Sequence, residues 1–322
     1  MRIPFREARL KPIVVGTLKY SKFITNLFPI AAGATGNARY CYAVWMRHLS
    51  YLARYNEGKI PANVTEIGPG DSFGVGLAAL LSGSESYFAL EAIEYWNSER
   101  NLRILDELIE LFLKKEVIPG NEEFPLLQPV MENYAFPSHI ITDAILQRSM
   151  DKHRIQQIRE ELMNPDNENN LMVRSKVPWH DKGIIKPESQ DFIFSHVVIQ
   201  HIEDIENAFS NMKYWLKPGG FVSHLIDYKS LGFTSRWNGH WTFSDWEWRL
   251  MVGGRKFSQN KLPHSSYIQL FKEYNFNILF LIINKKPNTL SKKRLAKKFR
   301  SLSDEDLNIC ESYFVAQKPL SE

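Results

Sequence analysis

The chain has 322 residues, of which 44% are hydrophobic and 13% aromatic, enough to form a sizeable core in one elaborated globular domain. Its formal net charge is only +4 at pH 7, so the overall charge gives no reason to expect a nucleic-acid partner. The two cysteines, Cys41 and Cys310, have no metal-ligand or redox spacing, which argues against a zinc or CxxC centre and favours a reducing, cytoplasmic environment.

Residues 1–62 are expected to form an N-terminal region. The longest apolar stretch there, residues 23–34, is short and is interrupted by Asn26 and Pro29, so we expect neither a signal peptide nor a membrane span. Apolar residues recur at helical spacing over residues 37–55. This pattern predicts a helix that caps the main domain, which we expect to span residues 63–322.

The main domain begins with alternating strand and helix patterns. A run of β-type residues breaks into a glycine turn, and the apolar segment after that turn stops at Gly83. Alternation of this kind predicts a parallel sheet with helices on both faces. The expected elements are a strand at 64–68, a helix at 75–81, a strand at 86–90 ending at Glu91, and a helix at 93–115.

Residues 117–170 interrupt this alternation. Two short helical patterns, at 138–150 and 151–163, lie between loops rich in proline and asparagine. We interpret the segment as a helical insertion or lid. The alternation then resumes, with strands expected at 171–177, 191–198, 221–226, 278–283 and 312–316, a helix at 202–216, a helix that starts at Ser265 or Ser266, and a basic helical stretch near 285–300.

The clearest chemical signal is Glu66-Ile67-Gly68-Pro69-Gly70 followed by a helix. Glycines at the carboxyl end of the first strand let the backbone turn sharply and approach a ligand closely, and the helix offers free N–H groups to an anion. Glu91, at the end of the second strand, is where doubly wound nucleotide sites place a carboxylate that accepts hydrogen bonds from ribose hydroxyls. An ordinary solvated acid at a strand end is the alternative role of Glu91.

These residues resemble the class I S-adenosylmethionine-dependent methyltransferases of the small-molecule type. The resemblance runs from about Val64 to Gln317. It is carried by the glycine turn, Glu91, the stretch from Asp191 to Ile202, and Leu216-Lys217-Pro218-Gly219-Gly220. It implies a doubly wound, mostly parallel, Rossmann-like sheet of seven strands with an antiparallel last strand, and S-adenosyl-L-methionine as cofactor.

The resemblance also implies cofactor contacts. Glu66, Gly68 and Gly70 would surround the methionine part, and Glu91 would hold the ribose. Asp181 would lie near the adenine amine, although it could equally cap the loop beside Gly183. Ser195, within the matching stretch of the fourth strand, completes the expected cofactor residues, and no metal ligand is expected.

Two rival functions remain open on this fold. A nicotinamide-dependent oxidoreductase prefers GxGxxG spacing, whereas here Gly68, Gly70 and Gly74 have one residue too many before the third glycine. A non-catalytic assembly module would be favoured if no cofactor bound.

The acceptor is expected to be a hydroxyl on a sugar or other small metabolite, since the chain resembles methyltransferases of surface-polysaccharide pathways. A hydroxyl acceptor benefits from a general base, and histidine suits that role because its ordinary pKa lies close to working pH. The candidates at the carboxyl edge of the sheet are His240, His196 and His201, and Asp227 is next in order if no histidine serves. The loop around His240 also carries Trp237 and Trp241, which could stack on a sugar or simply pack the loop.

The stretch from Lys285 to Arg300 is strongly basic. A solvated helix face is the ordinary use of such a run, and a landing surface for an anionic glycan, a nucleotide-linked sugar or a membrane surface is the sharper interpretation. The expected partner is thus a small-molecule or glycan acceptor, with the oligomeric state left open.

Overall fold

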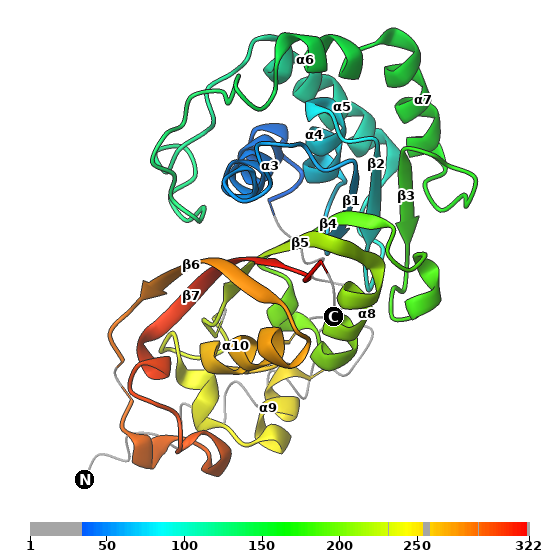
Figure 1. The fold of residues 1–322 in the computed structure, drawn as a ribbon. Coiled ribbons are helices and arrows are strands. Elements are labelled where there is room, and N and C mark those ends of the chain that lie inside the picture. Colours follow the sequence, from blue (N-terminus) through cyan, green and yellow to red (C-terminus); the bar gives the residue numbers. More distant parts are fainter. Residues whose placement is uncertain (1–33, 231, 254–257, 289, 321–322) are drawn as a thin grey trace.

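A seven-stranded sheet organises the molecule (Figure 1). The structure is a computed structural model, and it describes residues 34–230, 232–253, 258–288 and 290–320. The strand order is β3-β2-β1-β4-β5-β7-β6, and β7 is antiparallel to both of its neighbours. The strands are β1 (Asn63–Ile67), β2 (Ser86–Leu90), β3 (Val173–Lys176), β4 (Gln190–His196), β5 (Leu216–Asp227), β6 (Asn277–Lys285) and β7 (Ile309–Gln317).

The predicted fold class is therefore confirmed, including the antiparallel last strand. The strand at Ser86–Leu90 has the predicted bounds, and β3 lies within the predicted 171–177. Crossovers run in both directions from β1, which opens a crevice at the carboxyl ends of β1 and β4.

Side chains of each strand alternate between two cores, one on each face of the sheet. In β4, Phe192 and Phe194 join the core on one face, whereas Ile193 joins the core on the other. This alternation follows from the two-residue period of a strand. Both faces are buried, as a mostly parallel sheet requires.

Helices cover both faces (Figure 1). One face carries α3 (Ala38–Ala53), α4 (Gly74–Ser82) and α5 (Ser98–Leu113), with α6 (Asp143–Ser149) and α7 (Lys152–Met163) packed beside them. The other face carries α8 (Ile205–Trp215) and α10 (His264–Glu273), with α9 (Asp245–Val252) nearby. None of the helices within the described ranges combines the length and apolar character needed to cross a bilayer.

The helix α3 is part of the main core. Trp45, Arg47 and His48 are all fully buried, and α3 packs against α4, α5 and β5. The side chain of Asn37 caps its start by accepting a hydrogen bond from the Tyr40 N–H at 3.1 Å. The proposed boundary near residue 62 therefore runs through one continuous apolar cluster.

The insertion at 117–170 has two structurally different parts. Ile158 and Leu162 of α7, together with Ile141 before α6, are fully buried in the core. The preceding stretch, residues 117–137, has no regular secondary structure. Arg39 of α3 anchors that stretch through two hydrogen bonds of 2.8 Å to the Glu123 carboxylate.

The basic stretch was predicted as helical, and this is wrong. The structure has two short 3-10 turns there, Lys292–Arg294 and Lys297–Phe299. The reason is docking onto Trp241, because the Ala296 N–H donates to the Trp241 carbonyl at 3.0 Å while Leu295 and Phe299 are buried against the Trp241 side chain.

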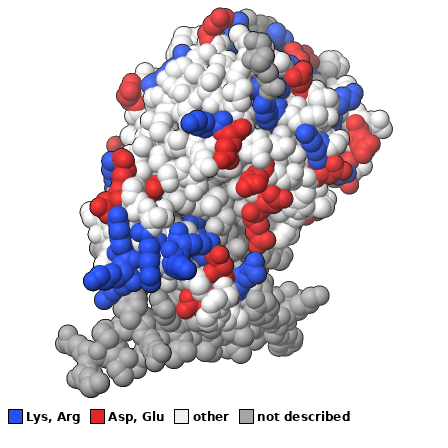
Figure 2. All heavy atoms as spheres, turned by 60° about the horizontal axis from the view of Figure 1, so that its bottom comes forward, with Lys and Arg blue, Asp and Glu red and all other residues white. Residues whose placement is uncertain are grey.

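Basic side chains gather in one patch at the end of the molecule brought forward in Figure 2. The exposed basic residues of this stretch are Lys285, Lys286, Lys292, Lys293, Arg294, Lys297, Lys298 and Arg300. Several of them are engaged, since Lys292 pairs with Asp304 at 3.1 Å and Lys298 with Asp245 at 2.6 Å.

Candidate functional site

The glycine turn after β1 adopts the backbone conformation that only glycine tolerates well. Gly68 and Gly70 have φ of +76° and +73°. The Gly68 N–H donates to the Leu90 carbonyl at 2.8 Å, which fixes the turn against the end of β2. A Cβ on Gly68 would lie 2.4 Å from Val198 Cγ1, so the turn and the segment after β4 are in close contact.

Two cavities meet at this contact. One is about 1030 Å³, and Glu66, Gly70, His196 and Asp227 are among its lining residues. The other is about 890 Å³, and its lining includes Glu91. Gly68, Val198 and His201 line both, so the two spaces lie on either side of the glycine turn. We name them the acceptor cavity and the Glu91 cavity.

Glu66 presents a buried carboxylate to the acceptor cavity. It is 2% exposed, and the Tyr87 hydroxyl donates to its Oε2 at 2.7 Å. Burial raises the pKa of Glu66 to about 8, with the nearby Glu91 carboxylate adding to the shift. A carboxylate placed in this way suits a cationic ligand group, which would restore its charge.

Glu91 joins the glycine turn to the second cavity. Its Oε1 accepts from the Ala92 N–H at 2.8 Å and its Oε2 from the Gly70 N–H at 3.3 Å. It is 8% exposed, and burial raises its pKa. Trp179 and His180, which follow β3, line the same cavity, so flat apolar surface lies near this carboxylate.

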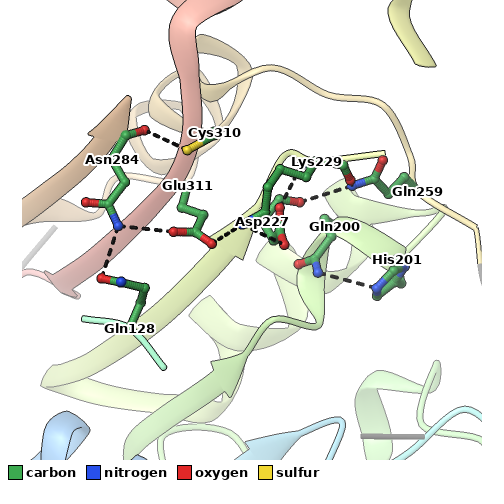
Figure 3. Close-up of polar contacts among 9 residues, drawn as sticks. All are labelled: Gln128, Gln200, His201, Asp227, Lys229, Gln259, Asn284, Cys310 and Glu311. Atoms are coloured by element: carbon green, nitrogen blue, oxygen red, sulfur yellow. Dashed lines mark hydrogen bonds and ion pairs between the residues drawn. The ribbon is translucent and has the colours of Figure 1, made fainter. Parts of the chain in front are cut away.

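Three charged residues that line the acceptor cavity form a cluster (Figure 3). Asp227 ends β5, Lys229 follows it, and Glu311 comes from the neighbouring β7. Lys229 Nζ lies 3.4 Å from Asp227 Oδ2 and is ion-paired with Glu311. Asn284 of β6 donates to Glu311 at 3.1 Å and to Gln128 of the insertion at 3.1 Å.

Within this cluster the acidity of Asp227 is unusual. Burial raises the pKa of Asp227 to about 6, and the nearby Lys229 ammonium limits the shift. The Lys229 N–H donates to Asp227 Oδ1 at 2.7 Å, which fixes the orientation of the carboxylate. A carboxylate with this pKa takes up a proton more readily than an ordinary one at neutral pH.

Two of the predicted catalytic histidines reach the acceptor cavity. His196 lies at the end of β4, and burial lowers its pKa to about 3. His201 lies between the two cavities, and both of its ring nitrogens are engaged, by the Ser258 carbonyl at 3.1 Å and by the Gln200 amide at 3.3 Å. Burial lowers the pKa of His201 as well.

His240 does not line either cavity. It is 1% exposed, packs against Trp241 with ring centroids 4.7 Å apart, and has its pKa lowered to about 3 by burial. The sequence suggested His240 because it lies in an aromatic loop after β5. The structure corrects this, since Trp241 and Trp248 hold His240 inside that loop.

Two of the expected cofactor residues also lie outside the cavity linings. Asp181 is exposed and caps the turn at Lys182–Ile184 by accepting from the Gly183 N–H at 2.8 Å. Ser195 is fully buried and its hydroxyl lies 2.8 Å from His224 Nδ1. Asp181 thus has the loop-capping role that was its alternative, and Ser195 packs inside the sheet.

The comparisons with known proteins also support a methyltransferase. A family model described as a methyltransferase domain matches residues 175–223, which run from β3 through β4 and α8 into β5. The match covers less than half of the chain, and within that part it supports a methyltransferase that uses S-adenosyl-L-methionine. The seven-stranded sheet with antiparallel β7 agrees with the fold that the resemblance implies.

Solved methyltransferase structures resemble the chain only remotely. A methyltransferase from Methanosarcina mazei has 13% identity and a TM-score of 0.40, with 80% of this chain and 92% of that chain covered. A putative sarcosine dimethylglycine methyltransferase from Galdieria sulphuraria has 12% identity and a TM-score of 0.43, with 87% and 85% covered. No match was found among curated proteins.

Proposed function

We propose that the protein is an S-adenosylmethionine-dependent methyltransferase that transfers the methyl group to a hydroxyl oxygen of a sugar or similar polar metabolite, with Asp227 as general base. The observation that carries the proposal is the position of Asp227. Asp227 ends β5 and lines the same cavity as Gly68 and Gly70, and burial raises its pKa to about 6. General bases work best when their pKa lies near the working pH.

The residues of the glycine turn fit the cofactor. Glu66 is a buried carboxylate with a neutral phenol as its side-chain partner, so the ammonium group of the methionine part matches it. Glu91 borders the other cavity beside Trp179, which suits a ribose next to a flat base. The bound cofactor supplies a methyl group on a sulfonium, and this group needs no further activation by the protein.

The protein itself aligns the acceptor hydroxyl and removes one proton from it. The acceptor hydroxyl loses its proton to an oxygen of Asp227 as the new oxygen–carbon bond forms and the sulfur–carbon bond breaks. Lys229 holds the Asp227 carboxylate in place and remains paired with Glu311. Because the cation stays near, the negative charge of Asp227 is tolerated in its buried position before the transfer.

The cavity lining favours a polyhydroxylated acceptor. Aromatic side chains stand on its walls beside hydroxyl groups and carboxylates, a mixture that suits sugars because rings cover their C–H faces and polar groups bind their hydroxyls. Trp237 is fixed for such contact, since its indole N–H donates to the Pro287 carbonyl at 3.1 Å. The aromatic lining residues are Tyr40, Phe124 and Trp237, and the residues with hydroxyl or carboxylate groups are Thr35, Glu66, Glu123, Asp227, Ser230, Thr234, Ser235 and Glu311.

The test is substitution of the base. Asp227→Asn keeps the shape of the side chain but cannot accept the proton, so turnover should fall by about a hundred- to ten-thousandfold with cofactor affinity unchanged. Turnover is measured by mass spectrometry on a panel of hydroxylated acceptors, and affinity by calorimetry. Asp191→Asn is the matched control, because Asp191 pairs with Lys217 at the opposite end of the sheet. Turnover of Asp227→Asn within a few-fold of the parent would refute the proposed role.

A further inference from the structure

A chain of four polar side chains runs from the core of the molecule to the acceptor cavity. The hydroxyls of Tyr313 and Ser223 lie 2.8 Å apart, and Ser223 Oγ lies 2.8 Å from His48 Nδ1. His48 Nε2 lies 3.3 Å from Nδ1 of His196, which lines the cavity. The four residues come from β7, β5, α3 and β4, so the fold brings this hydrogen-bonded series together from segments that are far apart in the sequence.

The inner end of this hydrogen-bonded series is closed off from solvent. Tyr313 is 1% exposed, Ser223 and His48 are fully buried, and the rings of Phe194 and Tyr313 lie 5.0 and 5.5 Å from the His48 ring. Within the part of the chain that the structure describes, Ser223 is the hydrogen-bond partner of the Tyr313 hydroxyl. At the outer end, His196 Nε2 has no side-chain or backbone partner among those described residues, and the ring is partly exposed.

Each of the two hydroxyls can donate to the other, since a hydroxyl is both donor and acceptor. The closed inner end then decides the direction of the hydrogen bonds. If Tyr313 donates to Ser223, then Ser223 donates to His48 Nδ1 and His48 donates from Nε2 to His196. In the reverse direction the Tyr313 proton has no acceptor, and an unpaired buried donor is costly. The forward direction gives the donors of Tyr313, Ser223 and His48 an acceptor each. It also leaves the His196 proton on Nε2, toward the cavity.

We propose that His196 binds the acceptor molecule as a neutral hydrogen-bond donor through Nε2, and that His48, Ser223 and Tyr313 are positioning residues that fix this tautomer. His196 Nδ1 already accepts from His48, so no lone pair remains for a proton from the acceptor. His196 is therefore not the general base. Burial lowers the pKa of both His48 and His196, which keeps the chain neutral at working pH.

This inference rests on the proposed function for its substrate. His196 pairs in register with Leu225, and Asp227 lies two residues further along β5, roughly 7 Å along the strand. Both side chains line the acceptor cavity. An acceptor that meets both therefore carries a second oxygen close to the hydroxyl that reacts. The acceptor class becomes a diol or a related polyol rather than an isolated alcohol.

The first experiment reads the tautomer in the full-length protein labelled with ¹⁵N-histidine. Two-bond ¹H–¹⁵N correlation spectra should show His196 as the neutral Nε2–H form from pH 5 to 9. Ser223→Ala, which removes only a hydroxyl, should replace that form by a mixture. His264→Phe is the control, because it breaks a buried serine–histidine pair of 2.8 Å, with Ser312, away from both cavities. A pure Nδ1–H form, a cationic ring, or a tautomer unaffected by Ser223→Ala would overturn the proposal.

The second experiment reads the contact with the acceptor. His196→Phe should raise KM for the acceptor about tenfold, the usual value of one lost neutral hydrogen bond, with little change in cofactor affinity. His196→Gln places an amide N–H near the position of Nε2 and should recover most of that loss. If glutamine is as damaging as phenylalanine, His196 does not act as a donor. The tautomer is measured without acceptor, so its outcome is independent of the assay that tests Asp227.

Discussion

Gly68 occupies a position where no side chain fits. With φ of +76°, its backbone is strained for other residues, and a Cβ there would lie 2.4 Å from Val198 Cγ1. Because Val198 lines both cavities, movement to relieve this contact would change both at once.

Gly68→Ala should therefore weaken cofactor binding by at least about tenfold while the fold persists, since φ strain of about 1–3 kcal/mol is added at the binding turn. Gly58→Ala is the matched control, with φ of +71° but nothing within 4 Å of a Cβ and no place in the lining of either cavity. It should lose some stability and keep its cofactor affinity. Equal affinities for both variants, measured by calorimetry, would contradict the role of Gly68.

The pH dependence of turnover separates Asp227 from the histidines. A general base works when deprotonated, and burial raises the pKa of Asp227 to about 6, so kcat/KM should rise as the pH increases through 6 and then level off. Histidines whose pKa is lowered to about 3 would cause no rising limb in the pH profile of kcat/KM between pH 5 and 8. In Asp227→Asn the limb should disappear from the residual activity. A limb that persists in that variant would assign the base to another group.

The sequence indicated some of these residues and missed others for a physical reason. Gly68 and Glu91 follow strands in a local pattern, so their spacing was enough to predict that they lie at the carboxyl edge of the sheet. His48 lies within a helix far upstream in the sequence, and nothing local shows that its ring reaches β4. Lys229 and Glu311 are likewise brought together only by the pairing of β5 with β7. The contact between His48 and His196 is the reason that we propose a different role for His196 from the one that its sequence position suggests.

At the scale of elements, hydrophobic periodicity predicts the regular helices and strands of the sheet domain. It does not predict segments whose conformation depends on tertiary contacts. The helix α9 was missed although Ser244 and Glu247 form a capping box at its start, a signal that the sequence does contain. The composition of the basic stretch predicts a helix. Its backbone instead bonds to Trp241, a tertiary contact that local propensity does not report.

The insertion at 117–170 remains a proposed lid, and its two parts should behave differently. Amides in α6 and α7 should exchange slowly in the free protein because Ile158 and Leu162 are fully buried. Residues 123–127 line the acceptor cavity, so their amides should exchange faster and slow down when cofactor and acceptor are both present. Hydrogen exchange read by mass spectrometry distinguishes these segments, and uniform protection over all of 117–170 in the free protein would make it a fixed insertion.

At the scale of the whole molecule, the sheet divides two cores, and the helix that the sequence suggested as a cap completes one of them. In α3, Tyr42, Val44, Trp45, Met46, Leu49 and Leu52 are all fully buried. The Trp45 indole N–H donates to Ser82 of α4 at 2.9 Å, and His48 reaches Ser223 of β5. A truncated chain that begins at Asn63 would expose the surfaces that these groups cover.

The free energy of burying the apolar side chains of α3 predicts the outcome of that truncation. Burial of six large apolar side chains contributes about 9–18 kcal/mol, and this matches or exceeds the usual net stability of a domain, about 5–15 kcal/mol. The chain 63–322 should therefore lack a cooperative thermal transition and bind hydrophobic dyes, whereas the full chain should melt in one transition. Circular dichroism and calorimetry measure both. A variant that begins at Ala34 is the control, because it keeps α3 and the Asn37 cap. If chain 63–322 melted cooperatively and bound S-adenosylmethionine as the full chain does, α3 would be a dispensable cap rather than part of the core.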